Sequence, residues 1–212
     1  MSLEGLKLAA LYSYGCQKAE RLKINDLLSD FIIAGTNRDV VEENLKKLLS
    51  YAWYQIIARS NKIKDPFDER VVRTYWTGSR LLRKIRGKDG RVLLPFHNFT
   101  VLGAHNQEQS LRDLDNCKVS IGRIEKMEGD NFSLSYYPLI ERNGNILLAD
   151  FYQPLLISNR GFVHDAKIGE WVTSHYRVAR QILSYKKAKQ FYFRSLEAVE
   201  LFNKSAKKAP HL

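Results

Sequence analysis

The stretch CKVSIGRIEKMEGD, from Cys117 to Asp130, decides how the second half of the chain is interpreted. A cysteine begins it, a glycine follows at Gly122, and apolar and polar residues then alternate up to Gly129. Alternation with a period of two is typical of a strand, and a Gly-Asp pair is typical of the hairpin turn that ends one. The stretch therefore predicts an antiparallel strand with Cys117 at its beginning.

The same period continues beyond this turn. Asn143-Gly144-Asn145 is a second hairpin signal, and Pro138 and Pro154 are expected at edges or bulges because proline cannot donate to a sheet ladder. A helix from about Ser184 to Asn203 is expected to follow, with apolar residues at helical spacing. The expected strands are Lys118–Met127, Phe132–Glu141, Ile146–Ile157 and Trp171–His175. This pattern predicts a small antiparallel barrel with a trailing helix.

The first part of the chain predicts helices. From Val40 to Ile57 the apolar residues recur at steps of three and four, which makes one helical face. A further helix is expected to open at Asp65-Pro66, since aspartate can cap a helix and proline fits its first position. The run RGKDG, from Arg86 to Gly90, predicts the boundary of this helical domain.

Between the two parts, VLLPFHNFTVLGA (Val92 to Ala104) is apolar and aromatic, so extended structure is expected there. The polar run that follows predicts one short helix or turn. The sequence thus predicts an α+β fold with a helical domain in residues 1–90, a connecting strand and loop in residues 91–116, and the barrel with its helix in residues 117–212.

The composition limits the possible functions. The chain has 212 residues, 44% hydrophobic and 27% charged, and a net charge of +11. A basic surface attracts polyanions, so nucleic acid is one expected class of partner, and the alternative is that the dispersed charge serves solubility alone. Two cysteines do not indicate a secreted disulfide scaffold, and a cytoplasmic location is expected. We expect no membrane span, because no apolar run is long enough for one.

Familiar catalytic motifs are absent, including a phosphate loop, GxSxG, HExxH and CxxC. The candidates for chemistry are Cys117, the pair His97-Asn98 inside an apolar run, His175 in WVTSHYRVA, and Cys16 after YSYG. Cysteine and histidine are ligands for iron, zinc or copper. The alternative for Cys117 is a small buried hydrophobe, and for the histidines a satisfied place in the core or on the surface.

The C-terminal helix leaves two interpretations open. It interleaves aromatic and basic residues on which bases could stack: Tyr185, Lys186, Lys187, Lys189, Phe191, Tyr192 and Arg194. The aromatic residues also fall at the spacing of a helix that packs against a core. The sequence alone does not separate a nucleic-acid surface from an ordinary amphipathic helix.

The stretch from Cys117 to about Asn203 resembles the HypC/HupF family of hydrogenase-assembly chaperones. The likeness rests on CKVSIGRIEKMEGD, then IGEWVTSHYRVA (Ile168 to Ala179), then LSYKKAKQFYFRSLEAVELF. It implies an OB-like barrel with a trailing helix. It also implies that the leading cysteine, here Cys117, handles the iron group destined for a nickel-iron site, and that His175 is a second functional position. Unlike the family cysteine, Cys117 is internal, and the proline that usually follows is replaced by Ser120-Ile121.

A wider resemblance covers most of the chain. The segments DPFDERVVRTYWTGSRLL, LPFHNFTVLGA and LDNCKVSIGRI are similar to the landmarks of an uncharacterised family of bacterial and archaeal proteins. That resemblance implies a shared purpose for Cys117, His97, Asn98 and the pair Tyr75-Trp76.

These observations lead to one expected function and two alternatives. We expect a non-catalytic accessory or maturation protein that binds a metalloenzyme subunit or a metal intermediate, with iron as the expected metal. Its metal ligands would come from Cys117, His175, His97 and Cys16, and the partner would contact Tyr75, Trp76 and Asn98. The alternatives are a nucleic-acid-binding module and a metal-dependent enzyme.

Overall fold

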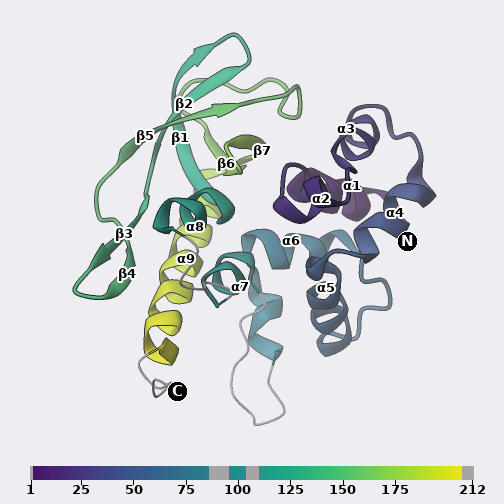
Figure 1. Ribbon diagram of the computed structural model, residues 1–212, viewed down its shortest axis with the longest axis horizontal. Helices are drawn as coiled ribbons and strands as arrows, with labels where there is room; N and C mark the ends of the chain where they lie inside the picture. The colour runs from purple at the N-terminus through teal and green to yellow at the C-terminus, as the bar shows by residue number, and fades with distance from the viewer. Residues whose placement is uncertain (1, 86–95, 104–109, 207–212) are drawn as a thin grey trace. The chain divides into compact units, whose positions relative to one another are not determined.

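The computed structural model describes residues 2–85, 96–103 and 110–206, and the chain forms two compact units, Met1–His97 and Asn98–Leu212 (Figure 1). The boundary signal at Arg86–Gly90 and residues 92–95 and 104 of the expected extended stretch lie outside the described residues. The mixed α+β fold class predicted from the sequence is confirmed, with a helical first unit and a barrel followed by a helix in the second.

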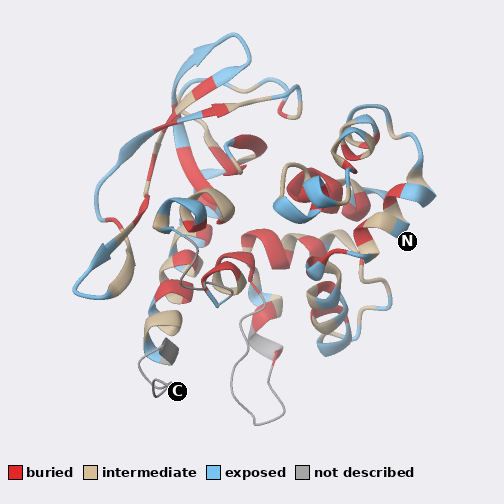
Figure 2. Ribbon diagram, in the orientation of Figure 1, coloured by how far each residue is buried: buried red, intermediate tan, exposed pale blue. Residues whose placement is uncertain are grey.

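The described part of the first unit is helical. Its elements are α1 (Leu3–Ser13), α2 (Gln17–Arg21), α3 (Asn25–Ala34), α4 (Arg38–Lys46), α5 (Leu49–Ser60), α6 (Glu69–Thr77) and the 3-10 helix η1 (Arg80–Lys84). Buried residues concentrate on α1 and α6 (Figure 2). Trp76, on α6, contacts both α1 and α5. Its ring stacks on Tyr12 of α1 at 5.1 Å between centroids, and its Nε1 donates to the hydroxyl of Tyr54 of α5 at 2.6 Å. An aromatic core therefore holds this unit together.

The single helix expected from Val40 to Ile57 is two helices. The chain leaves the helical conformation at Leu48, whose φ and ψ are −84° and 147°. Leu45, before the break, and Leu48, at the break, are both buried, whereas Leu49 is 81% exposed. The apolar spacing continues through the break, so periodicity alone did not reveal it.

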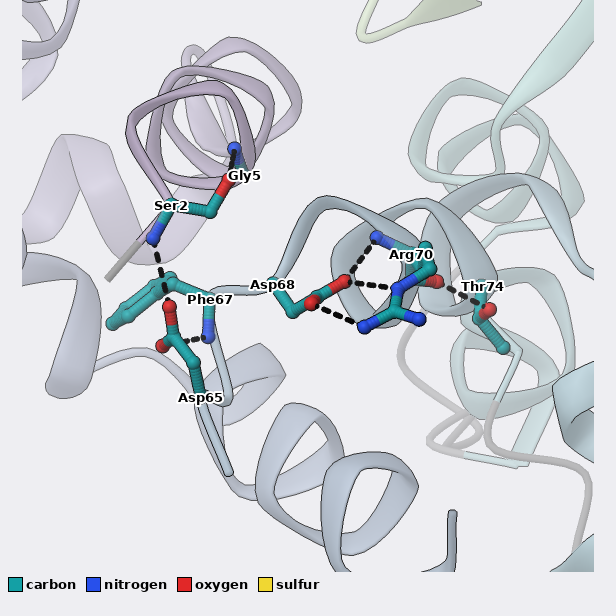
Figure 3. Close-up of polar contacts among 7 residues, drawn as sticks. All are labelled: Ser2, Gly5, Asp65, Phe67, Asp68, Arg70 and Thr74. Atoms are coloured by element: carbon teal, nitrogen blue, oxygen red, sulfur yellow. Dashed lines mark hydrogen bonds and ion pairs between the residues drawn. The ribbon is translucent and has the colours of Figure 1, made fainter. Parts of the chain in front are cut away.

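The helix expected at Asp65-Pro66 begins later, at Glu69 (Figure 3). The carboxylate of Asp65 accepts from the backbone N–H of Phe67 at 2.9 Å and from that of Ser2 at 2.8 Å, so it stabilises a turn. The N-cap of α6 is Asp68, whose Oδ1 accepts from the N–H of Arg70 at 2.9 Å. The expected cap at Asp65 is therefore wrong, and an aspartate three residues further along the chain caps the helix.

Helix α1 approaches this turn very closely. A Cβ atom added at Gly5 would lie 1.7 Å from the carbonyl oxygen of Phe67. Only glycine permits this approach, and the N–H of Gly5 also donates to the capping hydroxyl of Ser2 at 3.1 Å. The first unit therefore depends on glycine at this position.

The second unit consists of two short helices, a barrel, a separate hairpin and a long helix. Its elements are α7 (His97–Gly103), α8 (Leu111–Cys117), β1 (Ser120–Glu128), β2 (Asn131–Tyr136), β3 (Leu139–Arg142), β4 (Asn145–Leu148), β5 (Gln153–Ser158), β6 (Trp171–His175), β7 (Val178–Leu183) and α9 (Tyr185–Ala206). His97, the first residue of α7, is counted with the first unit. The barrel is closed in the order β1-β2-β5-β7-β6, and β3 and β4 form a two-stranded sheet.

The barrel strands pair antiparallel except for one parallel bridge between β5 and β7, at Ser158 and Val178. The two expected hairpin turns are confirmed, since Glu128 pairs with Asn131 across the first and Arg142 with Asn145 across the second. The expected strand Phe132–Glu141 is interrupted at Pro138, and β4 and β5 likewise replace one longer strand.

The close approach of β1 and β2 explains why residue 122 is a glycine. A Cβ atom there would lie 2.9 Å from the Cβ of Leu134 and 3.0 Å from the carbonyl oxygen of Ser135, both on the neighbouring strand β2. The glycine thus lets β1 and β2 come together over a core that includes Ile124, Phe132, Leu134 and Val172. Helix α9 is fixed to the β3–β4 hairpin, because the Asn203 side chain donates to and accepts from the backbone of Ile146.

The segment before the barrel is helical where it is described, so the expected extended structure is wrong for residues 97–103. Cys117 also ends a helix, α8, and does not begin the strand, which starts at Ser120. Helix α8 carries a capping box between Ser110 and Asp113, a signal of helix that the polar run did contain. The apolar run around His97 has no such signal, and an apolar run alone fits a short helix as well as a strand.

Candidate functional site

Cys117 is positioned by the end of α8. The next residue, Lys118, is extended, with φ and ψ of −64° and 148°, so the chain turns from helix to strand directly after the cysteine. The Cys117 side chain is half-buried, and neither it nor Cys16 is in a disulfide. The side chain packs against the core cluster that includes Leu114 and Val199, and part of the residue stays exposed.

His175 is the last residue of β6, and its side chain is 1% exposed. The tight turn to β7 consists of Tyr176 and Arg177, with φ of 50° and 57°. This turn is bound to α8 next to the cysteine: the Tyr176 N–H donates to the carbonyl of Asn116 at 3.0 Å, and Arg177 Nε donates to the Asn116 side chain at 3.0 Å. Because Asn116 precedes Cys117 and Tyr176 follows His175, these bonds bring the thiol and the imidazole together.

His97 is the third residue of the group. It begins α7, and the adjacent Asn98 is fixed to the chain just after Cys117. Asn98 Nδ2 donates to the carbonyl of Val119 at 2.9 Å, and Asn98 Oδ1 accepts from the Val119 N–H at 2.7 Å. A third bond runs from Nδ2 to the hydroxyl of Ser195 at 3.1 Å. These bonds fix Asn98, near the start of α7, to the chain that follows Cys117.

These three side chains form a group in which each side chain offers one possible ligand atom. A nitrogen of His97, the sulfur of Cys117 and a nitrogen of His175 all lie within 4.8 Å of one another. Both histidines are buried, and the cysteine is half-buried. Three of the four residues expected to bind a metal are thus brought together in the described part of the chain.

Cys16, the fourth candidate, does not belong to this group. It is the N-cap of α2, and its sulfur accepts from the N–H of Ala19 at 3.3 Å. The structure gives this cysteine a local role at a helix start.

The residues expected to contact a partner lie inside the chain. Tyr75, Trp76 and Asn98 are 4%, 3% and 3% exposed. Within the first unit, the Tyr75 hydroxyl is 3.2 Å from His97 Nδ1, and the Trp76 ring lies 4.3 Å from the His97 ring. Their contact with a partner stays a prediction; what the structure describes is packing around a histidine.

A buried ion pair lies directly beside the cysteine in the sequence. Lys118 Nζ is 3.0 Å from Asp115 Oδ1 and donates to the Ser120 hydroxyl at 2.5 Å. Burial lowers the pKa of Lys118, and Asp115 opposes that shift. Asp115 also accepts from the Tyr136 hydroxyl at 2.8 Å and from the Leu139 N–H at 2.7 Å. The pair ties the end of α8 to the barrel.

Sequence reasoning missed Asp115, Asn116 and Lys118. They lie in LDNCK, around a residue that was recognised, but exposed loops commonly carry such polar residues. The single available signal was their proximity to Cys117.

The three donors fit a transition-metal ion. Thiolate and imidazole suit zinc, copper and iron, and ligands about 2.0–2.3 Å from a tetrahedral ion are about 3.3–3.8 Å apart. The ligand atoms of the three side chains lie up to 4.8 Å apart, and shifts of about 1 Å would bring them to these distances. Small side-chain rotations supply such shifts. Three protein ligands leave a fourth position for an exchangeable ligand.

The fold and the site define a two-unit α+β protein with a Cys/His/His group beside an OB-like barrel. The chain belongs to the family described as "Family of unknown function (DUF6390)", whose model matches residues 43–91 and 91–209. This confirms the predicted resemblance to an uncharacterised family, whereas the HypC/HupF resemblance is not shown. Searches of curated proteins and of solved structures gave no match. In the described residues, no helix combines the length and apolar character needed to cross a bilayer.

Proposed function

We propose that this protein binds a transition-metal ion through Cys117, His175 and His97 and serves as a non-catalytic accessory protein in the maturation of a metalloenzyme. The observation that carries the proposal is the convergence of the three ligand atoms within 4.8 Å. Two buried histidines and a cysteine this close together can bind one metal ion, because thiolate and imidazole are strong ligands for divalent metals.

The access to the site supports handling of a metal over permanent storage. Structural zinc sites are closed by four protein ligands, whereas three ligands leave a position for a ligand from outside. Among the described residues the group has three members, and its cysteine is half-buried. A ligand from a partner protein or from a small molecule occupies that fourth position on the metal.

The particular class of metalloenzyme follows from the resemblance to HypC/HupF chaperones. That resemblance implies roles for a leading cysteine and a histidine, which fall on Cys117 and His175, and these are two of the three residues in the group. On this basis the cargo is an iron-containing group, and the partner is a subunit or maturation factor of a hydrogenase-type enzyme.

The first test is metal binding by the purified full chain. Iron(II), under anaerobic conditions, and zinc(II) are titrated separately, and bound metal is measured after gel filtration. We expect about one equivalent per chain, lost in Cys117→Ala and His175→Ala. The matched controls are Cys16→Ala and His164→Ala, which remove a cysteine and an exposed histidine outside the group. Retention of full stoichiometry in Cys117→Ala contradicts the metal site.

The second test separates an accessory role from an enzyme. The tagged chain is used to capture partners from the native host, with Cys117→Ala and Cys16→Ala as the matched pair. A metalloenzyme subunit or maturation factor captured by the parent and by Cys16→Ala, but not by Cys117→Ala, supports the proposal. Metal binding without any such partner contradicts the accessory role while leaving the metal site intact.

A further inference from the structure

A surface on the second unit gathers aromatic rings around the first half of α9. We define the α9 aromatic patch as the five residues Tyr137, Tyr152, Tyr185, Tyr192 and Phe193. Tyr137 lies between two other rings, 4.4 Å from Tyr152 and 4.5 Å from Tyr192 between centroids. The Tyr192 ring is in turn 5.9 Å from that of Phe193. Four of the rings therefore form one connected surface, and the fifth, Tyr185, lies 6.2 Å from the ring of Trp171 on β6.

These rings are not packed into the core. Tyr185, Phe193 and Tyr152 are 65%, 55% and 52% exposed, and Tyr137 and Tyr192 are half-buried. Phe191, on the same helix, is 2% exposed and serves the core. The core-packing interpretation of this helix is therefore correct for the face that carries Phe191, and the nucleic-acid interpretation stays a prediction for the exposed face. Three of the rings in the patch are more than half exposed, so burial in a core of the described residues does not account for them.

The charge around the patch is positive. Lys186, Lys187 and Lys189 are exposed on the same part of α9, and Lys189 Nζ lies 5.9 Å from the centre of the Phe193 ring. The segment YKKAKQFYFR, from Tyr185 to Arg194, contains no carboxylate. One acidic residue outside it, Asp150, also raises the pKa of Tyr192, after the larger effects of burial and of Tyr152.

We propose that the α9 aromatic patch binds single-stranded nucleic acid. Bases stack on exposed aromatic rings, and neighbouring lysines neutralise phosphates, which is the usual combination in single-strand binding proteins. Lysine is depleted in protein–protein interfaces, so its interleaving with the rings favours a nucleic acid over a protein partner. Tyr185 and Phe193 are about 12 Å apart along the helix, which is room for more than one nucleotide. This site is separate from the metal site and does not depend on it.

The test is fluorescence anisotropy of the full chain with labelled oligo(dT) and oligo(rU) of about 15 nucleotides, and with a duplex of equal length. Both single strands are expected to bind more tightly than the duplex. Phe193→Ala and Tyr185→Ala are each expected to raise Kd by about 5- to 140-fold, the equivalent of one lost stacking contact. Engagement of three lysines predicts a slope of about −2 in a plot of log K against log salt concentration.

The controls match the variants in chemistry. Leu156→Ala removes an apolar side chain that is 58% exposed on β5, and Lys126→Glu reverses a charge on β1 as Lys189→Glu does on α9. The controls are expected to leave Kd within about twofold. The proposal is overturned by an absence of binding at low salt, by equal binding of duplex, or by equal effects of Lys126→Glu and Lys189→Glu. Cys117→Ala is expected to bind the oligonucleotides as the parent does.

Discussion

Asn98 and Val119 are joined by two hydrogen bonds that run in opposite directions, one from the Val119 N–H at 2.7 Å and one to the Val119 carbonyl at 2.9 Å. The amide side chain thus pairs with the backbone as a neighbouring strand would. Asn98 follows His97, and Val119 lies two residues after Cys117. This one side chain therefore fixes the start of α7 to the chain that follows Cys117, one of the proposed metal ligands.

Replacing this amide should weaken both the fold and the metal site. Asn98→Leu leaves a buried N–H and a buried carbonyl of Val119 without partners, at a cost of roughly 2–5 kcal/mol. We expect a lower urea midpoint and, in the folded fraction, weaker metal binding. Asn203→Leu is the matched control, because Asn203 makes the same pair of bonds with Ile146 in the β3–β4 hairpin. If the two variants lose metal affinity equally, Asn98 has no particular role at the site.

The ion pair of Asp115 and Lys118 predicts an asymmetry. Asp115→Asn leaves a buried ammonium without its carboxylate and should cost roughly 3–5 kcal/mol. Lys118→Met should cost less, because Asp115 keeps the donors of Tyr136 and Leu139. Since burial lowers the folded-state pKa of Lys118, the deficit of Asp115→Asn should shrink as pH rises towards the unfolded value of about 10.4. Urea denaturation at several pH values measures this, and a deficit that grows with pH contradicts it.

The start of α6 should be sensitive to acid. Hydrogen bonds from Arg70 lower the pKa of Asp68, so the stability it provides is present above the unfolded value of about 3.9 and lost as pH falls through the lower folded-state pKa. Asp68→Asn should therefore lower the urea midpoint at neutral pH but not at about pH 2. In an Arg70→Met background the difference between the two pH values should become smaller; an unchanged difference contradicts the assignment to this pair.

Two glycines of the second unit should respond in opposite ways to alanine. Gly122→Ala places a methyl group 2.9 Å from the Cβ of Leu134 and should cost roughly 1–3 kcal/mol through overpacking. Gly103→Ala, at the end of α7, meets no atom of the described residues within 4 Å and should be neutral or stabilising by up to about 1 kcal/mol. Thermal unfolding of the two variants measures this, and equal stability would show that β1 and β2 can separate at no cost.

Much of the fold was predictable because its signals are local. Gly129-Asp130 and Asn143-Gly144 are turn sequences, and the structure has hairpins at both. Strand β7 was missed because its hairpin turn is Tyr176-Arg177, two residues that rarely adopt positive φ and carry no turn signal. Helix α7 was missed because an apolar run fits a short helix as well as a strand, and the partners of Asn98, Val119 and Ser195, are distant in sequence.

The candidate site was predictable in its members but not in its assembly. Residue chemistry alone selected Cys117, His97 and His175, and it selected Cys16 equally. What separates them is the contact of Asn116 with the turn after His175, together with the Asn98 pairing. Such long-range bonds leave no pattern in a single sequence, so the choice between the two cysteines needed the structure.

The most direct test of the central claim is X-ray absorption of the zinc-loaded full chain, with Cys117→Ala and Cys16→Ala measured alongside. The account predicts a first shell with one sulfur at about 2.3 Å and two nitrogens at about 2.0–2.1 Å. The sulfur should disappear in Cys117→Ala and remain in Cys16→Ala. A parent shell of oxygen and nitrogen alone, or a sulfur that persists in Cys117→Ala, would contradict the account.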